Sequence, residues 1–87
     1  MEYEIIWSIS AVKQLKSLDR SIAKRIYEKV DALSINPERY VEKFVRYPYY
    51  RLRVGDYRVI LDIKHKSVRI LILKVGHRSA VYERWIF

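Results

Sequence analysis

Three apolar-rich runs in the second half of the chain constrain its fold more than any other feature. They cover residues 49–54, 57–63 and 68–75 and are rich in Val, Ile, Leu and Tyr, which favour strands. Only Gly55 and Asp56 separate the first run from the second, and the polar segment 64–67 precedes the third. Gly-Asp is typical of a two-residue type II′ turn, because glycine supplies the positive φ of its first central position. We therefore predict three consecutive antiparallel strands.

The first half of the chain predicts one strand followed by two helices. Residues 2–7 are rich in strand-forming side chains. Ser8 or Ser10 can cap a short helix, since apolar residues recur at positions 9, 12 and 15. Asp19 can cap a longer amphipathic helix, in which apolar residues recur every three or four positions up to Leu33.

The segments around these elements complete the predicted fold. Asn36 precedes Pro37 and is expected to end the second helix, because the residue before a proline avoids the α region. Residues 38–48 are expected to form a loop, and residues 78–87 fit either a strand or a helical turn. The predicted order is β-α-α-β-β-β plus a short C-terminal element. This is an α+β fold, with the N-terminal helix pair packed on one face of an antiparallel C-terminal sheet.

Length and composition limit the class of protein. The 87 residues fit one small domain, residues 1–87, which should bury roughly 60–65% of the surface of its unfolded chain. The chain has no cysteine, which excludes disulfides and thiolate metal sites, and its two histidines lack further ligands at metal-binding spacing. No motif indicates a cofactor. Neither a signal peptide nor a membrane span is recognisable, so a cytoplasmic protein without a membrane partner is expected.

The net charge of +8 comes entirely from residues 43–78, which carry ten Lys and Arg against two acidic residues, Asp56 and Asp62. Elsewhere the charges balance. Because these cations lie within predicted strands, the excess charge is fixed on a folded sheet. A basic sheet is expected to bind a polyanion or an acidic protein.

Arginines of the first predicted hairpin are expected to share one face of the sheet. Arg51 and Arg53 alternate with apolar residues, and the two-residue turn brings Arg58 beside them. Lys74, His77 and Arg78 close the last predicted strand, and four tyrosines lie nearby, at positions 47, 49, 57 and 82. Cations with flat aromatic rings are typical of surfaces that hold single-stranded nucleic acid. Three residues before or at the hairpin, Lys43, Arg46 and Tyr49, are expected to bind RNA.

Simpler interpretations stay open at this point. The arginines can be only the solvated face of a strand, and most of the tyrosines are ordinary half-buried strand residues. His65 lies in a polar turn, whereas His77 adjoins Arg78 and is the better candidate for a titrating group. Paired carboxylates, a Gly-rich phosphate loop and a Ser-His-Asp arrangement have no support in the sequence.

Two segments identify a family resemblance. The sequence YRLRVGDYRVI at positions 50–60, and VGHR at positions 75–78 followed by Val81 and Tyr82, resemble the RelE/ParE toxin superfamily, most closely archaeal RelE-type toxins. The likeness covers nearly the whole chain. It implies a toxin of a type II toxin–antitoxin pair, a ribosome-dependent endoribonuclease in which the 2′-hydroxyl of mRNA attacks the adjacent phosphate and leaves a cyclic phosphate and a free 5′-hydroxyl.

The resemblance also implies roles for individual residues. Arg58 matches the arginine that stabilises charge on the phosphate, and Arg78 the arginine that acts as acid toward the leaving 5′-oxygen. Tyr82 matches the tyrosine that stacks on the base. Arg51 and Arg53 fall where the family often has lysines. Because a guanidinium keeps its proton up to about pH 12, an arginine is a poor general base at neutral pH. Either the two arginines act electrostatically, or another group accepts the proton.

We name His77 and Lys74 as hypotheses for that proton acceptor. The resemblance further implies two partners: the ribosomal A site with its mRNA, and an acidic, partly disordered RelB-like antitoxin that covers the basic sheet. Operator DNA would be bound only through the antitoxin. A ParE-like inhibitor of DNA gyrase and a non-catalytic RNA-binding module remain as alternatives.

Overall fold

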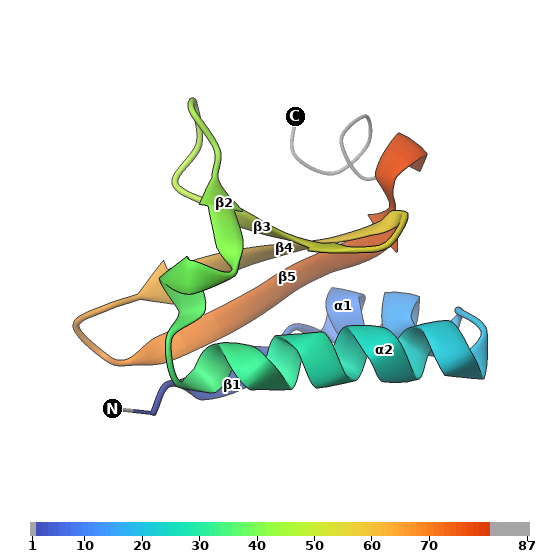
Figure 1. Ribbon diagram of the computed structural model, residues 1–87, viewed down its shortest axis with the longest axis horizontal. Helices are drawn as coiled ribbons and strands as arrows, with labels where there is room; N and C mark the ends of the chain where they lie inside the picture. The colour runs from blue at the N-terminus through green and yellow to red at the C-terminus, as the bar shows by residue number, and fades with distance from the viewer. Residues whose placement is uncertain (1, 81–87) are drawn as a thin grey trace.

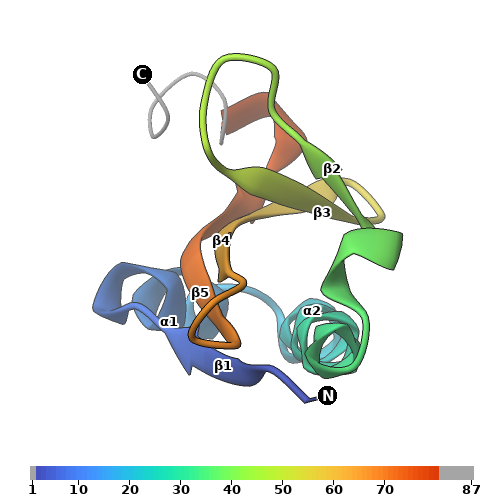
Figure 2. The same ribbon diagram turned by 90° about the vertical axis from the view of Figure 1, so that its left-hand side faces the viewer.

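A five-stranded sheet with two helices on one face forms the architecture of the protein (Figure 1, Figure 2). The computed structural model describes residues 2–80. In chain order the elements are β1 (Glu4–Trp7), α1 (Ile9–Lys16), α2 (Arg20–Asp31), the 3-10 turns η1 (Ala32–Ser34) and η2 (Pro37–Arg39), β2 (Val41–Lys43), β3 (Tyr50–Val54), β4 (Tyr57–Lys64) and β5 (Arg69–His77). None of the helices in this part of the chain is long and apolar enough to cross a membrane.

The sheet has the order β1-β5-β4-β3-β2. Neighbouring strands are antiparallel except for β1, which joins the edge of the sheet parallel to β5. The predicted α+β class and the three consecutive antiparallel strands are thus confirmed. Gly55 has a φ of 58°, and Asp56 has no positive φ, as a type II′ turn requires. Val68, in the turn between β4 and β5, also has a positive φ, 56°, which is strained for a β-branched residue.

Two sequence predictions were wrong in detail. The segment expected to be a loop contains η2 and the short strand β2, which pairs with β3. The second helix does not run to Asn36, because α2 ends at Asp31 and the chain tightens into η1. That tighter turn completely buries Leu33, so tertiary packing determines the helix end before Pro37 does. Residues 78–80 are helical, which answers the open question for that part of the C-terminal segment.

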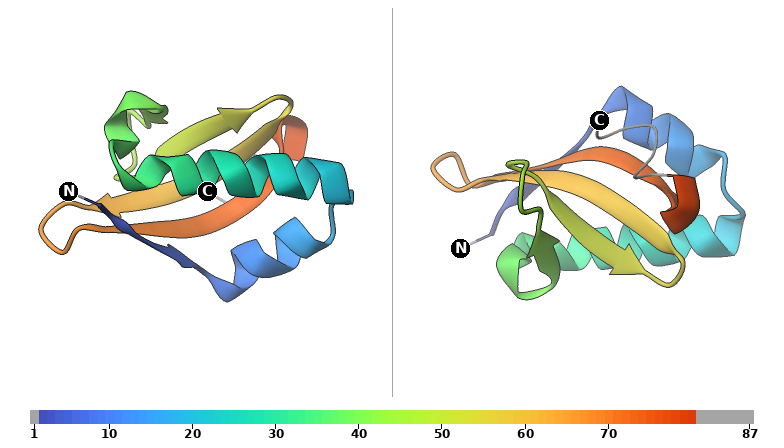
Figure 3. Two further views of the ribbon diagram at one scale, coloured as in Figure 1. Left: turned by 60° about the horizontal axis from the view of Figure 1, so that its bottom comes forward. Right: turned by 90° about the horizontal axis from the view of Figure 1, so that it is seen from above.

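The helices lie over one face of the sheet, as Figure 3 shows from two sides, and the core lies between these two layers. Ala11 of α1 and Ile26 and Val30 of α2 pack there against buried residues of the three long strands. Ser8 caps α1, since its Oγ accepts from the Ala11 N–H, and it also donates to the Leu73 carbonyl at 3.0 Å. The helix pair therefore covers one face of the sheet, as predicted, and leaves the other face available for the basic side chains.

Candidate active site

The β3–β4 hairpin places arginines on the sheet face opposite the helices. Leu52 and Val54 are buried in the core, so the alternating residues Arg51 and Arg53 point to the other side. Arg53 pairs directly with Arg58 across the hairpin, and paired residues of antiparallel strands share a face. The three side chains thus lie on one face, as the alternation in the sequence predicted.

A fourth arginine joins them from the end of β5. The backbone N–H of Arg78 donates to the Asp56 carbonyl at 2.8 Å, which ties this segment to the hairpin turn. Arg51, Arg53, Arg58 and Arg78 together line a hollow of about 270 Å³. The expected convergence of guanidinium groups from adjoining strands is therefore present. Their chemical roles stay predictions.

Arg58 is the fixed member of this set, which we call the arginine pocket. Its side chain is only 6% exposed, and among the described residues no other charged side chain is buried. Nη1 donates to the carbonyls of Gly55 and Tyr57, both at 2.8 Å, so the turn itself holds the guanidinium. A guanidinium has five N–H donors, and the other three remain for a ligand. The residue opposite Arg58 on β5 is Gly76, which adds no side chain to the pocket.

Glu42 and Phe44, which no motif in the sequence marks, orient Arg51. Glu42 lies 3.6 Å from the Arg51 Nε, and the guanidinium carbon lies 5.5 Å from the centre of the Phe44 ring. Glu42 belongs to β2, in the segment that the sequence predicted to be a loop, and it pairs with Arg51 in the sheet register. No sequence signal marked it, because only the pairing of β2 with β3 brings it to this face.

The two hypothetical proton acceptors do not line the arginine pocket. His77 pairs with Tyr57, the neighbour of Arg58, so its ring faces the helix side of the sheet and packs edge-on against Tyr57 at 5.4 Å. Its Nδ1 lies 2.8 Å from the Ser79 Oγ. The Lys74 Nζ donates to the Ser10 Oγ of α1 at 3.1 Å. In the described part of the chain neither side chain lines the arginine pocket, although Lys74, which pairs with Ile60, shares the sheet face of Arg51.

None of the three expected RNA-binding residues lines the arginine pocket, and Lys43 pairs with Tyr50, which packs against the core, so Lys43 lies on the helix side of the sheet. The Lys43 Nζ lies 5.9 Å from the Tyr50 ring centre, and Arg46 lines a separate hollow of about 450 Å³ in the β2–β3 loop. Tyr49 accepts the Phe44 N–H through its backbone carbonyl at 3.0 Å. Tyr82, the expected base-stacking residue, lies outside the described residues.

The pKa of Tyr50, the chain neighbour of Arg51, excludes this residue as a general base. Burial raises the pKa of the Tyr50 phenol, and the carboxylates of Glu38 and Asp62 raise it further, so this tyrosine keeps its proton at neutral pH and is no general base. Within residues 2–80 no group of three metal-ligating side chains comes together. The arginine pocket can bind an anion and stabilise negative charge that develops on it.

Comparison with known proteins connects this pocket with a family. Residues 5–82 match the family of the ParE toxin of type II toxin–antitoxin systems, parDE. The toxin RelE3 of Methanocaldococcus jannaschii is 29% identical over 86 residues, which cover 92% of this chain and 96% of the relative.

Two solved complexes contain similar chains. One is the archaeal RelE–RelB complex from Pyrococcus horikoshii, with 34% identity, a TM-score of 0.78, and coverage of 92% of this chain and 99% of the other. The second is the RelBE2 toxin–antitoxin complex of Mycobacterium tuberculosis, with 26% identity, a TM-score of 0.84, and coverage of 90% and 100%. Chains of this fold are thus known in complexes between a toxin and an antitoxin.

Proposed function

Because this chain belongs to the ParE toxin family of type II toxin–antitoxin systems, within the RelE/ParE superfamily, we propose that it is a ribosome-dependent endoribonuclease that inhibits translation by cutting mRNA. The observation that supports this proposal is the arginine pocket. Four like charges around one hollow repel one another until an anion enters, and a phosphodiester of RNA is such an anion.

In the proposed reaction the 2′-oxygen forms a bond to phosphorus while the bond between phosphorus and the 5′-oxygen breaks. The phosphorane-like transition state gathers negative charge on its oxygens. Arg58, held by the turn carbonyls, stabilises this charge without having to reorient, which is the condition under which such donors are most effective. Arg78 donates a hydrogen bond to the leaving 5′-oxygen, which takes its proton from water to become the 5′-hydroxyl, and Arg51 and Arg53 add positive potential.

The proton of the 2′-hydroxyl has to go to another group. Guanidinium does not lose its proton at neutral pH, so none of the four arginines can accept it. Since His77 faces the helix side of the sheet and Lys74 reaches α1, we assign proton acceptance to a group outside the arginine pocket. On this proposal the ribosome positions the mRNA and completes the site.

We also propose that an antitoxin controls the activity. The relatives from P. horikoshii and M. tuberculosis are known in complexes with an antitoxin. A net charge of +8, fixed on the sheet, calls for an acidic partner that covers the arginine face.

Primer extension in a translating extract tests the nuclease. The protein is added to purified ribosomes that translate a defined mRNA, and the 5′ ends of the fragments are mapped. We expect cuts in phase with the codons, and none on the same mRNA without ribosomes. Intact mRNA in the translating reaction would overturn the proposal. The match to the ParE toxin family favours inhibition of DNA gyrase as a second candidate function. A supercoiling assay on the same sample measures it.

A further inference from the structure

The loop between β2 and β3 forms a hollow of its own. It measures about 450 Å³ and is lined by four consecutive residues, Phe44, Val45, Arg46 and Tyr47. We call it the loop hollow. The loop rises from the sheet on the side away from the two helices, as both Figure 1 and Figure 2 show. It therefore lies on the same side of the sheet as the arginine pocket.

Strand alternation turns both ends of this loop toward the arginines. Glu42 of β2 pairs with Arg51, whose side chain points away from the core. Phe44 follows Glu42 by two residues and Tyr49 precedes Arg51 by two residues, so both side chains share the face of Arg51. The Phe44 N–H donates to the Tyr49 carbonyl at 3.0 Å, which extends the pairing of the two strands to these residues and closes the loop.

One contact joins the loop hollow to the arginine pocket. Phe44 lines the loop hollow, and Arg51 lines the arginine pocket. The guanidinium carbon of Arg51 lies 5.5 Å from the centre of the Phe44 ring, so the two hollows adjoin at this pair. A molecule with a phosphate in the arginine pocket can thus reach the loop hollow with the group next to that phosphate. In RNA that group is a nucleoside with its base.

The side chains of the loop hollow suit an unpaired base. Phe44 and Tyr47 supply aromatic rings, and every base has a π-face that stacks on such rings. Arg46 supplies a cation for an adjoining phosphate. A volume of about 450 Å³ is in the range of sites for small organic groups. An acidic peptide would also meet the cation, but continuity with a phosphate site favours a nucleotide.

The positions of the arginines indicate which base this is. Arg78, which donates to the leaving 5′-oxygen in the proposed reaction, is tied to the hairpin turn through the Asp56 carbonyl. Arg51 lies on β3, two residues farther from that turn than Arg53. The attacking and leaving oxygens lie roughly in line across phosphorus. The nucleotide that supplies the 2′-hydroxyl therefore lies toward Arg51, and this is the nucleotide on the 5′ side of the cut.

We propose that the loop hollow is the subsite for the base on the 5′ side of the cut, and that Tyr47 sets the preference among bases by stacking on it. This inference rests on the proposed nuclease function for the cut itself. It makes the β2–β3 loop a specificity-determining element, although the charge on the phosphate is stabilised by the four arginines.

Cleavage of ribosome-bound mRNAs that differ only in the base 5′ to the mapped cut tests the proposal. The unmodified protein should cut faster after a purine than after a pyrimidine, because the larger ring stacks more strongly. Tyr47→Ala should slow cleavage after a purine by about 5- to 150-fold, as for the loss of one stacked base, and should reduce the preference. Tyr47→Phe keeps the ring and should keep both rate and preference. No base preference in the unmodified protein, or an equal loss for all four bases in Tyr47→Ala, refutes the proposal.

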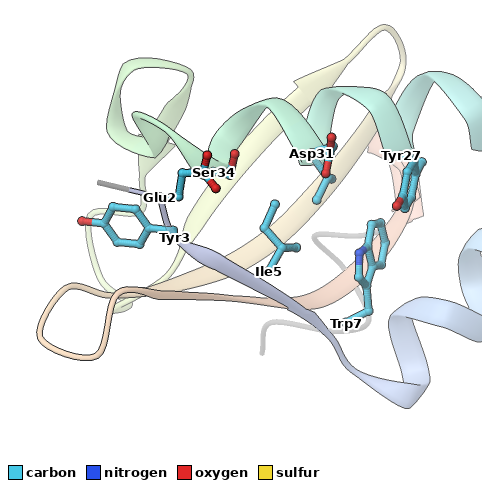
Figure 4. A pocket seen from close by; sticks show the side chains of 8 residues that line it. Glu2, Tyr3, Ile5, Trp7, Tyr27, Asp31 and Ser34 are labelled. Carbon is cyan, nitrogen blue, oxygen red and sulfur yellow. The ribbon is translucent and has the colours of Figure 1, made fainter.

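Tyr27→Ala is the matched control on the other side of the sheet. Tyr27 is 54% exposed and lines a hollow of about 550 Å³ between β1 and α2 (Figure 4), where its ring stacks on that of Trp7. This variant also loses one aromatic ring but leaves the loop hollow intact, so its cleavage rate and base preference should be those of the unmodified protein. Loss of base preference in Tyr27→Ala as large as in Tyr47→Ala contradicts the proposal.

Fluorescence of 2-aminopurine separates the subsite from the nuclease. The probe is placed at each position of the A-site codon in turn, and 2′-deoxyribose in that codon removes the attacking hydroxyl. Saturating protein should quench the probe at the position 5′ to the cut, and Tyr47→Ala should restore part of the fluorescence. If a protein that cuts mRNA shows no quenching that depends on Tyr47, or if Tyr47→Ala weakens only antitoxin binding, the proposal is refuted. Quenching that depends on Tyr47 in a protein that cuts no mRNA would refute the nuclease and leave the base site intact.

Discussion

Replacement of Arg58 by alanine tests both halves of the reasoning about the arginine pocket. This side chain is 6% exposed and donates to two carbonyls of the hairpin, Gly55 and Tyr57. We expect Arg58→Ala to lose both stability and cleavage activity. Arg53 is the matched control, because it lies directly across the hairpin from Arg58 but is exposed.

The expected loss in the free energy of unfolding of Arg58→Ala follows from the contacts of the arginine. Hydrogen bonds to a charged donor contribute about 1.5–3 kcal/mol each, although the released carbonyls of a surface turn recover part of this from water. Removal of a like charge opposite Arg53 returns about 0.2–1 kcal/mol. The net loss in the free energy of unfolding is therefore about 2 kcal/mol, which lowers Tm by roughly 8–16 °C in a domain of this size. Arg53→Ala breaks no such bond, and its Tm should stay within about 2 °C of the unmodified protein.

Activity should respond differently from stability. Both arginines face the proposed phosphate, so each alanine variant should cut ribosome-bound mRNA about 10²–10³ times more slowly. Arg58→Lys keeps the charge, but an ammonium group lacks the planar set of donors that bonds both carbonyls and still faces the phosphate. This variant should therefore be more active than Arg58→Ala and less active than the unmodified protein. The measurements are thermal unfolding by circular dichroism and single-turnover cleavage below the Tm of each variant. If Arg58→Ala keeps the unmodified rate, or if Arg53→Ala is destabilised as strongly as Arg58→Ala, the reasoning is refuted.

Three further predictions concern the turn, the histidine and the charge. Val68→Asn should raise the free energy of unfolding by about 1 kcal/mol in urea titrations, because asparagine tolerates the positive φ that strains valine, and an unchanged midpoint would contradict this. His77→Gln should keep the cleavage rate, since the ring packs on Tyr57 on the helix side of the sheet, and a large loss in the same assay would return His77 to the site. The logarithm of the binding constant for single-stranded RNA should fall with the logarithm of the salt concentration, with a slope of about −0.7 for each phosphate contacted. Arg53→Ala should make this slope about 0.7 shallower, and an unchanged slope would remove Arg53 from the phosphate contacts.

The sequence determined the local elements and much of the site. Alternation of apolar and basic residues fixed which face of β3 carries Arg51 and Arg53, and Gly55 fixed the turn that brings Arg58 beside them. These predictions succeeded because strand periodicity and two-residue turns depend on neighbours in the chain. The resemblance to the RelE/ParE superfamily was likewise carried by short contiguous segments.

Only the tertiary structure decided the contacts between distant segments. The short strand β2 forms because β3 offers it a partner, and that pairing brings Glu42 to Arg51. The register of β4 with β5 turned His77 away from the arginine pocket, although it is the chain neighbour of Arg78. The parallel pairing of β1 with β5 placed Trp7 against Tyr27 of α2, with ring centres 6.1 Å apart. Side-chain direction and strand pairing depend on hydrogen bonds between residues far apart in the sequence, and local periodicity holds no information about such partners.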